Sequence, residues 1–121
     1  MIGYEDFEIT MTRGDERAVR FTVIDTNNSS QPVDLTGYTN LQFLAKKRFS
    51  DLDAAAVVNL TMGSGLTVTN ASGGVIDLET PRAQTNALAN RRHQLPAILR
   101  GDNASGKRKT IQRGLLVVYP N

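Results

Sequence analysis

Apolar and polar residues alternate with a period of two along much of this chain, which is the pattern of half-buried β-strands. In the segment RAVRFTVID, Val19, Phe21 and Val23 fall on one face, and Arg20 and Thr22 fall on the other. A shift of one residue would expose all three large apolar side chains, so the register of this strand is well specified. The segment predicts a strand with one face on a core.

Other segments repeat this alternation. FEITMTRGD has Phe7, Ile9 and Met11 in phase and ends in a turn signal at residues 13–15. LQFLAKKR, GGVIDLET and LPAILRG predict further strands, and Leu44 breaks the alternation of the first, so we expect it to contact a neighbouring surface. The final run, GLLVVYP, predicts a core strand with Leu115, Val117 and Tyr119 on one face and Leu116 and Val118 on the other.

Between the apolar runs, DTNNSSQP, GSGLTVTNASGG and GDNASGK are rich in turn-forming residues and predict loops or hairpin ends. TPRAQTNALANRR predicts a helix of two to three turns, with Thr80 as N-cap and Pro81 at the first helical position. DLDAAAVVNL is ambiguous, and we interpret it as a turn leading into a strand. The segment PVDLTGY predicts a crossover, in which Asp34 and Thr36 bond nearby backbone amides and Gly37 takes a conformation that other residues avoid.

Composition sets the remaining bounds. The chain has 121 residues, 40% of them hydrophobic, which predicts a single domain over residues 1–121. The 14 Lys and Arg against 12 Asp and Glu leave a net charge of +2, a small surplus that argues against nucleic acid as the partner. There is no cysteine, and neither a signal peptide nor a membrane span is indicated. With many strands and one helix, the sequence predicts an all-β fold, an antiparallel immunoglobulin-like β-sandwich of about seven strands.

The order of the motifs TRGDERAVRFTVID, PVDLTGYTNLQFLAKK and GLTVTNASGGVIDLETPRAQTNAL, followed by a final strand, resembles small β-sandwich proteins encoded among the structural genes of tailed bacteriophages. The resemblance covers most of the chain, from Ile9 to Pro120. One departure is the basic stretch NRRHQLPAILRGDNASGKRKT, where members of that family usually carry a shorter, more acidic and aromatic run.

This resemblance implies a non-enzymatic structural protein of the virion, assembled in the host cytoplasm. Its station is implied to be the tail, the baseplate or a fibre attachment, with capsid decoration as an alternative. The partners would be other phage structural proteins, and a homo-oligomer within the particle is expected, because repeated symmetric contacts make weak interfaces stable. No membrane partner is expected.

No constellation of residues predicts catalysis, a cofactor or a metal. His93 is the single histidine and lies among Arg91 and Arg92 without a nucleophile-elbow pattern, so we expect a solvated loop histidine. Asp51 and Asp53 are two residues apart but lack the rest of a calcium-binding loop. The sequence therefore predicts no enzyme.

The candidate partner contacts are aromatic residues near the N-terminus and basic residues in two loops, namely Tyr4, Phe7, Arg91, Arg92, Lys107, Arg108 and Lys109. A third basic cluster is formed by residues 46–48. The terminal segments 1–8 and 119–121 are expected to be extended and to lie against a neighbour's sheet edge or surface. The competing functional hypothesis is a carbohydrate-binding or host-surface binding module, which the absence of tryptophan makes weaker.

Overall fold

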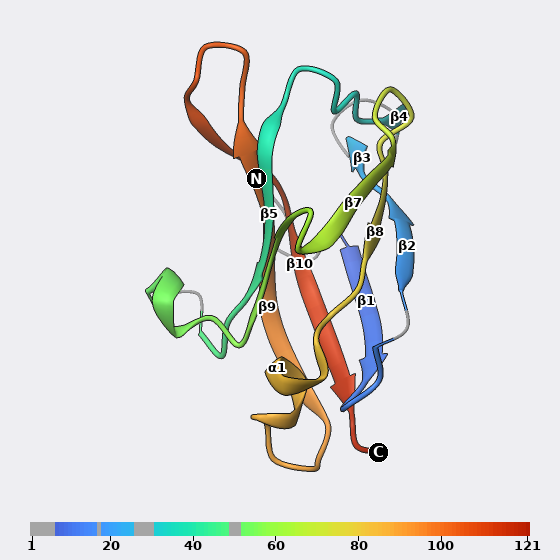
Figure 1. Ribbon diagram of the computed structural model, residues 1–121, viewed down its shortest axis with the longest axis vertical. Coiled ribbons are helices and arrows are strands. Elements are labelled where there is room, and N and C mark those ends of the chain that lie inside the picture. Colours follow the sequence, from blue (N-terminus) through green and yellow to red (C-terminus); the bar gives the residue numbers. More distant parts are fainter. Residues whose placement is uncertain (1–6, 17, 26–30, 49–51) are drawn as a thin grey trace.

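The computed structural model describes residues 7–16, 18–25, 31–48 and 52–121, and nearly all regular structure in these ranges is β-strand (Figure 1). The strands are β1 (Phe7–Thr12), β2 (Val19–Thr22), β3 (Ile24–Asp25), β4 (Gln31–Pro32), β5 (Thr39–Ala45), β6 (Val58–Met62), β7 (Gly65–Asn70), β8 (Val75–Leu78), β9 (His93–Asp102) and β10 (Arg108–Tyr119). A single turn of 3-10 helix, η1 (Asp53–Ala55), and a short helix, α1 (Arg82–Asn86), complete the set. The prediction of an all-β fold is confirmed. None of the helices in the described ranges has the length and apolar character needed to cross a membrane.

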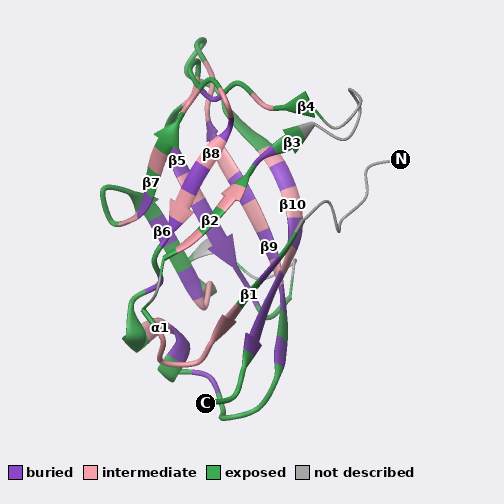
Figure 2. Ribbon diagram, turned by 90° about the vertical axis from the view of Figure 1, so that its right-hand side faces the viewer, coloured by how far each residue is buried: buried purple, intermediate pink, exposed green. Residues whose placement is uncertain are grey.

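Eight strands form one continuous sheet in the order β1-β10-β9-β5-β6-β7-β8-β2, while β3 and β4 pair separately. The prediction of a purely antiparallel arrangement is wrong, because β1 runs parallel to β10 and β6 runs parallel to β7. The sheet curls around the core like a barrel, so that strands from its two halves bury side chains against one another (Figure 2). Its end strands, β1 and β2, are not paired with each other.

The core is filled by the inward faces of the strands, as the period-two pattern predicts. Phe43 is its largest fully buried side chain and lies opposite Leu99 of β9 and Leu60 of β6. The buried residues of this core are Ile9, Val23, Leu35, Leu41, Phe43, Ala45, Val58, Leu60, Leu66, Ile76, Leu78, Leu88, Leu95, Ala97, Leu99, Leu116 and Val118. Leu116 and Val118 share one face of the last strand, as the alternation predicts, and this face points to the core.

Leu44 and Val117 are fully buried, yet they belong to the opposite face of the sheet. Leu44 lies opposite Ile98 of β9, in the row that alternates with the core row of Phe43 and Leu99. We expected Leu44 to contact a neighbouring surface, and its burial within this chain shows that it has no area left for a partner. The break in alternation marks a place where the outer face of the sheet is also buried.

The outward face predicted for the strand at residues 19–23 is correct, because Arg20 and Thr22 are exposed. Val23 is fully buried, whereas Phe21 is only partly buried and packs against the edge of the core. The reason is that β2 is an end strand and pairs only with β8, so a neighbouring strand lies on only one side of Phe21.

The crossover PVDLTGY joins β4 to β5, and Asp34 behaves as predicted, since its Oδ1 accepts a hydrogen bond from the Thr36 amide at 2.9 Å. The prediction for Gly37 is wrong, because Gly37 has an ordinary φ and open space around its Cα. The positive φ is at Asn40 instead, at 51°. There the register of β5 against β9 shifts, and asparagine tolerates this conformation better than most residues.

Two other predictions need correction. The helix is one to two turns long rather than two to three, because Pro81 has an extended ψ of 139° and serves as N-cap, so that the helix starts only at Arg82. Oγ1 of Thr80 is buried and has no hydrogen-bond partner among the described residues, so Thr80 does not cap the helix. The stretch GSGLTVTNASGG was predicted to be a loop or a hairpin end, and it contains β7, which pairs with β8 and whose residue Leu66 packs into the core. The segment DLDAAAVVNL is confirmed as a turn, η1, that leads into β6.

Candidate functional site

The two candidate contacts near the N-terminus differ in what the structure describes. Tyr4 lies outside the described residues. Phe7 begins β1, and its backbone is paired opposite Gly114 of β10. Thus β1 is held against β10 from its first residue.

The C-terminal end is attached to the loop before β9. Tyr119 ends β10 with 42% of its surface exposed, and its ring lies 5.8 Å from the guanidinium carbon of Arg92. The amide of Asn121 donates a hydrogen bond to Oδ1 of Asn90 at 3.1 Å. Arg92 therefore has an aromatic contact within this chain, while Arg91 is exposed on the same loop.

The candidate basic residues do not form one patch. Arg91 and Arg92 precede the first residue of β9, and residues 107–109 follow its last residue and lead into β10. Because β9 has ten residues and a strand rises about 3.3 Å per residue, the two groups are separated by about 30 Å. They belong to opposite ends of the sheet.

The prediction that His93 is a solvated loop residue is wrong. His93 is the first residue of β9, pairs with Val118 of β10 and is only 9% exposed. Its Nε2 lies 2.9 Å from the carbonyl oxygen of Ala89, within hydrogen-bond distance. The ring thus ties the loop after α1 to the start of β9, a structural role.

A polar network that sequence reasoning did not find lies on the outer face of β5, β9 and β10. Oε1 of Gln42 accepts hydrogen bonds from Nε and Nη2 of Arg100 at 3.1 and 2.9 Å, and from Nη1 of Arg108 at 3.0 Å. Nε of Arg108 also donates to Oδ1 of Asp102 at 3.1 Å. The other carboxylate oxygen of Asp102 accepts a bond from Nδ2 of Asn40 at 2.9 Å.

These contacts set the electrostatics of the network. Hydrogen bonds from Asn40 and then from Arg108 hold the pKa of Asp102 below its ordinary value, so that the carboxylate stays charged. Arg108 contacts both this carboxylate and the neutral Gln42 amide, and Arg100 contacts the Gln42 amide. The sequence signal is weak: polar residues alternate at 40 and 42 and at 100 and 102, but only the pairing of β5 with β9 brings them together.

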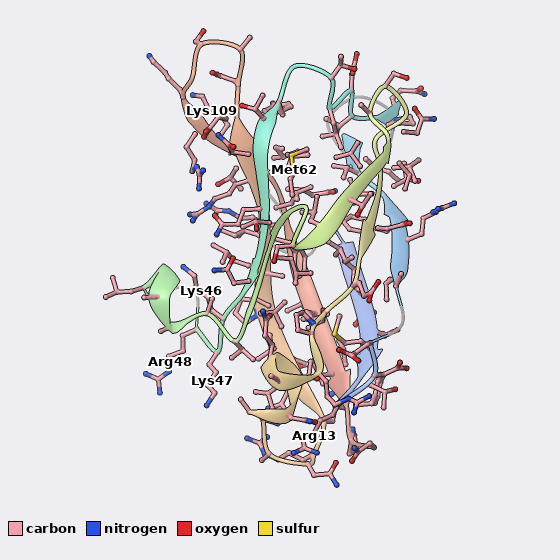
Figure 3. All side chains as sticks on the ribbon, viewed as in Figure 1. Arg13, Lys46, Lys47, Arg48, Met62 and Lys109 are labelled. Carbon is pink, nitrogen blue, oxygen red and sulfur yellow. The ribbon has the colours of Figure 1, made fainter. Side chains whose placement is uncertain are left out.

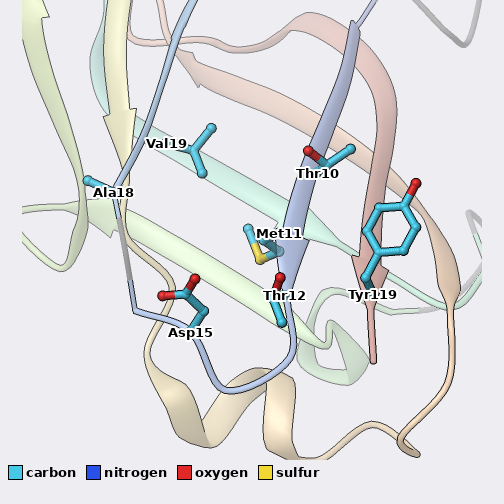
Figure 4. Close-up of a pocket in the computed structure, with 7 residues that line it drawn as sticks. All are labelled: Thr10, Met11, Thr12, Asp15, Ala18, Val19 and Tyr119. Atoms are coloured by element: carbon cyan, nitrogen blue, oxygen red, sulfur yellow. The ribbon is translucent and has the colours of Figure 1, made fainter. Parts of the chain in front are cut away.

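A pocket of about 360 Å³ opens between β1 and β2, the two end strands of the sheet, which are not paired with each other. Figure 4 shows Thr10, Met11 and Thr12 of β1 on one wall and Val19 at the start of β2 on the other. Asp15 and Tyr119 are also part of the lining. The pocket marks the place where the barrel-like sheet stays open.

The residues considered for a metal give no site in the described part of the chain. Asp51 lies outside the described residues, and those that are described contain no group of three or more histidine, aspartate or glutamate side chains placed to hold a metal ion.

Comparison with known proteins gives little. No family model matches this chain, and no curated protein matches it. Among solved structures, murine CRIg is similar over 93% of this chain and 90% of its own, with 13% sequence identity and a TM-score of 0.38. A likeness at this level carries no argument about the function of this chain.

Proposed function

We propose that this protein is a non-enzymatic structural component of a bacteriophage particle, placed in the tail, the baseplate or a fibre attachment, and that it acts by contact with other proteins. The observation that carries the proposal is the order of the motifs TRGD, PVDLTGY and TPRAQTNAL along the chain. Each of them has a structural part in the fold: a turn after β1, a crossover into β5, and the segment of α1. A capsid decoration protein is the alternative within this class.

The proposal includes an immunoglobulin-like sandwich. Its two layers would be β1-β10-β9-β5-β6 and β7-β8-β2, divided between β6 and β7. Two features support this division. β6 and β7 pair at only two positions, Thr61 with Gly65 and Met62 with Leu66, and β1 lies parallel to β10 at the edge of the first layer. A sandwich presents loops and strand edges to its neighbours without needing a catalytic centre.

The experiment that tests the function is immunogold labelling of particles from the phage whose genome carries this gene, with an antibody against the purified protein. Labels at the tail or its tip support the proposal, and labels over the capsid support head decoration. Particles without label, confirmed by mass spectrometry of their proteins, would overturn both. A glycan array addresses the competing binding module, for which specific and saturable binding to one glycan class is the expected result.

Deletion of residues 1–5 tests whether the N-terminal segment is a contact element. We expect the truncated protein to keep its circular dichroism spectrum and to incorporate into particles less efficiently than the full chain. If it incorporates normally, the contact surface lies elsewhere, and if it unfolds, the segment belongs to the fold.

A further inference from the structure

Several basic side chains lie on one side of the molecule. In Figure 3 the labelled side chains of Lys46, Lys47, Arg48 and Lys109 all lie on the same side, at the left of the view. The outer face of β5, β9 and β10 adds Arg100, Arg108 and Arg113. Among the described residues of this face the carboxylates are Glu8, at the edge in β1, and Asp102, which is already paired. We call the outer face of β5, β9 and β10 the basic sheet face.

The arginines at one end of the basic sheet face are held in place before any partner arrives. Arg108 is fixed by Asp102 and Gln42, and Gln42 also fixes Arg100. Gln42 is itself anchored, because its Nε2 donates to Oδ1 of Asn59 at 2.9 Å. A guanidinium group that is already oriented loses less conformational entropy when it binds a carboxylate, and its planar geometry suits a bidentate contact.

An apolar side chain lines the same cavity as Arg108. A cavity of about 480 Å³ is lined by Asn40, Leu41, Gln42, Thr61, Met62 and Arg108. Met62 is 47% exposed, which makes it one of the large apolar side chains on the surface. Methionine adapts its shape to a bound apolar group, and arginine with a neighbouring apolar anchor is typical of the centre of protein interfaces.

We propose that the basic sheet face is a docking surface for an acidic segment of a partner protein. Carboxylates of that segment pair with Arg108 and Arg100, and an apolar side chain between them enters the cavity against Met62. The inference rests on the proposed contact function, but not on the particle in which the contact is made. Charge complementarity selects an acidic partner, and the cavity selects one that also carries an apolar residue.

Nucleic acid fits this face less well. The lining of the cavity contains a methionine and no aromatic ring, whereas single-stranded nucleic acids are held largely by bases stacked on aromatic side chains.

The test is a titration of the isotope-labelled full-length protein followed by NMR. The probes are a peptide of alternating glutamate and leucine, the matched peptide of glutamine and leucine, and an oligothymidylate with the same net charge as the first. We expect the acidic peptide to shift amides of β5, β6, β9 and β10 around Met62, and the neutral peptide to have little effect. The Arg108→Gln variant should weaken binding of the acidic peptide roughly tenfold.

The matched control is Arg91→Gln, which removes the same charge at the other end of β9 and should leave binding within about twofold. Met62→Ser keeps the charges, and of the three probes only the acidic peptide should bind it more weakly. Equal losses in Arg108→Gln and Arg91→Gln would mean unspecific attraction and overturn the proposal. Absence of shifts on this face, or tighter binding of the oligothymidylate than of the peptide, would also overturn it. These outcomes are separate from the immunogold result, so either proposal can fail alone.

Discussion

Nε of Arg13 donates a hydrogen bond to the carbonyl oxygen of Leu88 at 2.8 Å, although the two residues are far apart in the sequence. Nη2 of Arg13 donates to the carbonyl of Asn86 at 3.1 Å, and the amide of Gly14 donates to Oγ1 of Thr85 at 2.9 Å. The turn after β1 is therefore fixed to α1 and the loop after it, near the label of Arg13 in Figure 3. The arginine of this Arg-Gly-Asp sequence therefore has a structural role within the chain.

Arg13→Ala should lower the free energy of unfolding by about 1.5–3 kcal/mol, because it removes charged hydrogen bonds and leaves the carbonyls of Leu88 and Asn86 without this partner. A urea melt measures the change. Arg91→Ala, which removes an exposed arginine from a nearby loop, should change the stability by no more than about 0.5 kcal/mol. Equal effects of the two substitutions would contradict the assigned role of Arg13.

Phe43→Ala should be among the most damaging core substitutions, with a loss of about 3–5 kcal/mol, because Phe43 is fully buried and its removal leaves a cavity. Phe21→Ala should cost less, about 1–3 kcal/mol, because this ring is only partly buried at the edge of the core. Thr22→Ala on the exposed face is the control. If Phe21→Ala were as damaging as Phe43→Ala, the packing around β2 would differ from the one described.

The alternation of apolar residues was enough to predict the inward faces of β1 and β2 and to separate the two faces of β10. This succeeded because the side-chain period of a strand is fixed by its backbone, whatever its partners are. The pairing of strands could not be predicted in the same way, since the parallel contacts of β1 with β10 and β6 with β7 depend on how distant segments meet. β7 was missed because its run LTVT is flanked by glycine, serine and asparagine residues that favour turns, and pairing with β8 completes the strand.

Glycine positions show the same limit. Gly37 was predicted to have a positive φ and does not, whereas Gly74 is one of the glycines that do, with φ at 70°. A Cβ at Gly74 would lie 2.6 Å from the carbonyl oxygen of Val33 and 2.9 Å from that of Val23. The sequence shows that a turn is present, but it does not show which glycine lies against another backbone.

Gly74→Ala should therefore lower the free energy of unfolding by at least about 2 kcal/mol, since the methyl group would meet backbone atoms that cannot move aside and φ would be strained. Gly37→Ala is the matched substitution at an open position with an ordinary φ. It should change the stability by at most about 0.5 kcal/mol. Thermal melts of the two variants followed by circular dichroism compare them, and a reversed order would remove this account of both glycines.

The network of Gln42, Arg100, Asp102 and Arg108 was only partly predictable. Arg108 was a candidate from the charge of its loop, but its partners come from β5 and β9, and a single bulge in β5 decides which of their residues are opposite. The role of His93 was missed for a related reason, because its neighbours in the sequence are polar while its partner in space is the carbonyl of Ala89. Both cases depend on tertiary contacts that no local pattern records.

Three aspartates with lowered pKa values should make the protein less stable in acid. Hydrogen bonds from Arg20, from Thr36 and from Asn40 with Arg108 lower the pKa of Asp77, Asp34 and Asp102, respectively. A carboxyl group whose pKa is lower in the folded state binds its proton more readily in the unfolded state. The stabilisation is therefore complete above the ordinary pKa of about 4 and is lost as the pH falls through the lowered values.

Asp77 allows the sharpest measurement of this effect. Its two carboxylate oxygens accept bonds from Nε and Nη2 of Arg20 at 2.8 and 3.1 Å across the pairing of β2 with β8. Asp77→Asn should be less stable than the parent at neutral pH, and the difference should shrink between about pH 4 and pH 2, where the parent loses the charged contact. Glu79→Gln, at a carboxylate two residues further along the chain, is the control and should follow the parent curve closely. An unchanged difference for Asp77→Asn across this range would show that the contact with Arg20 does not contribute to the acid sensitivity.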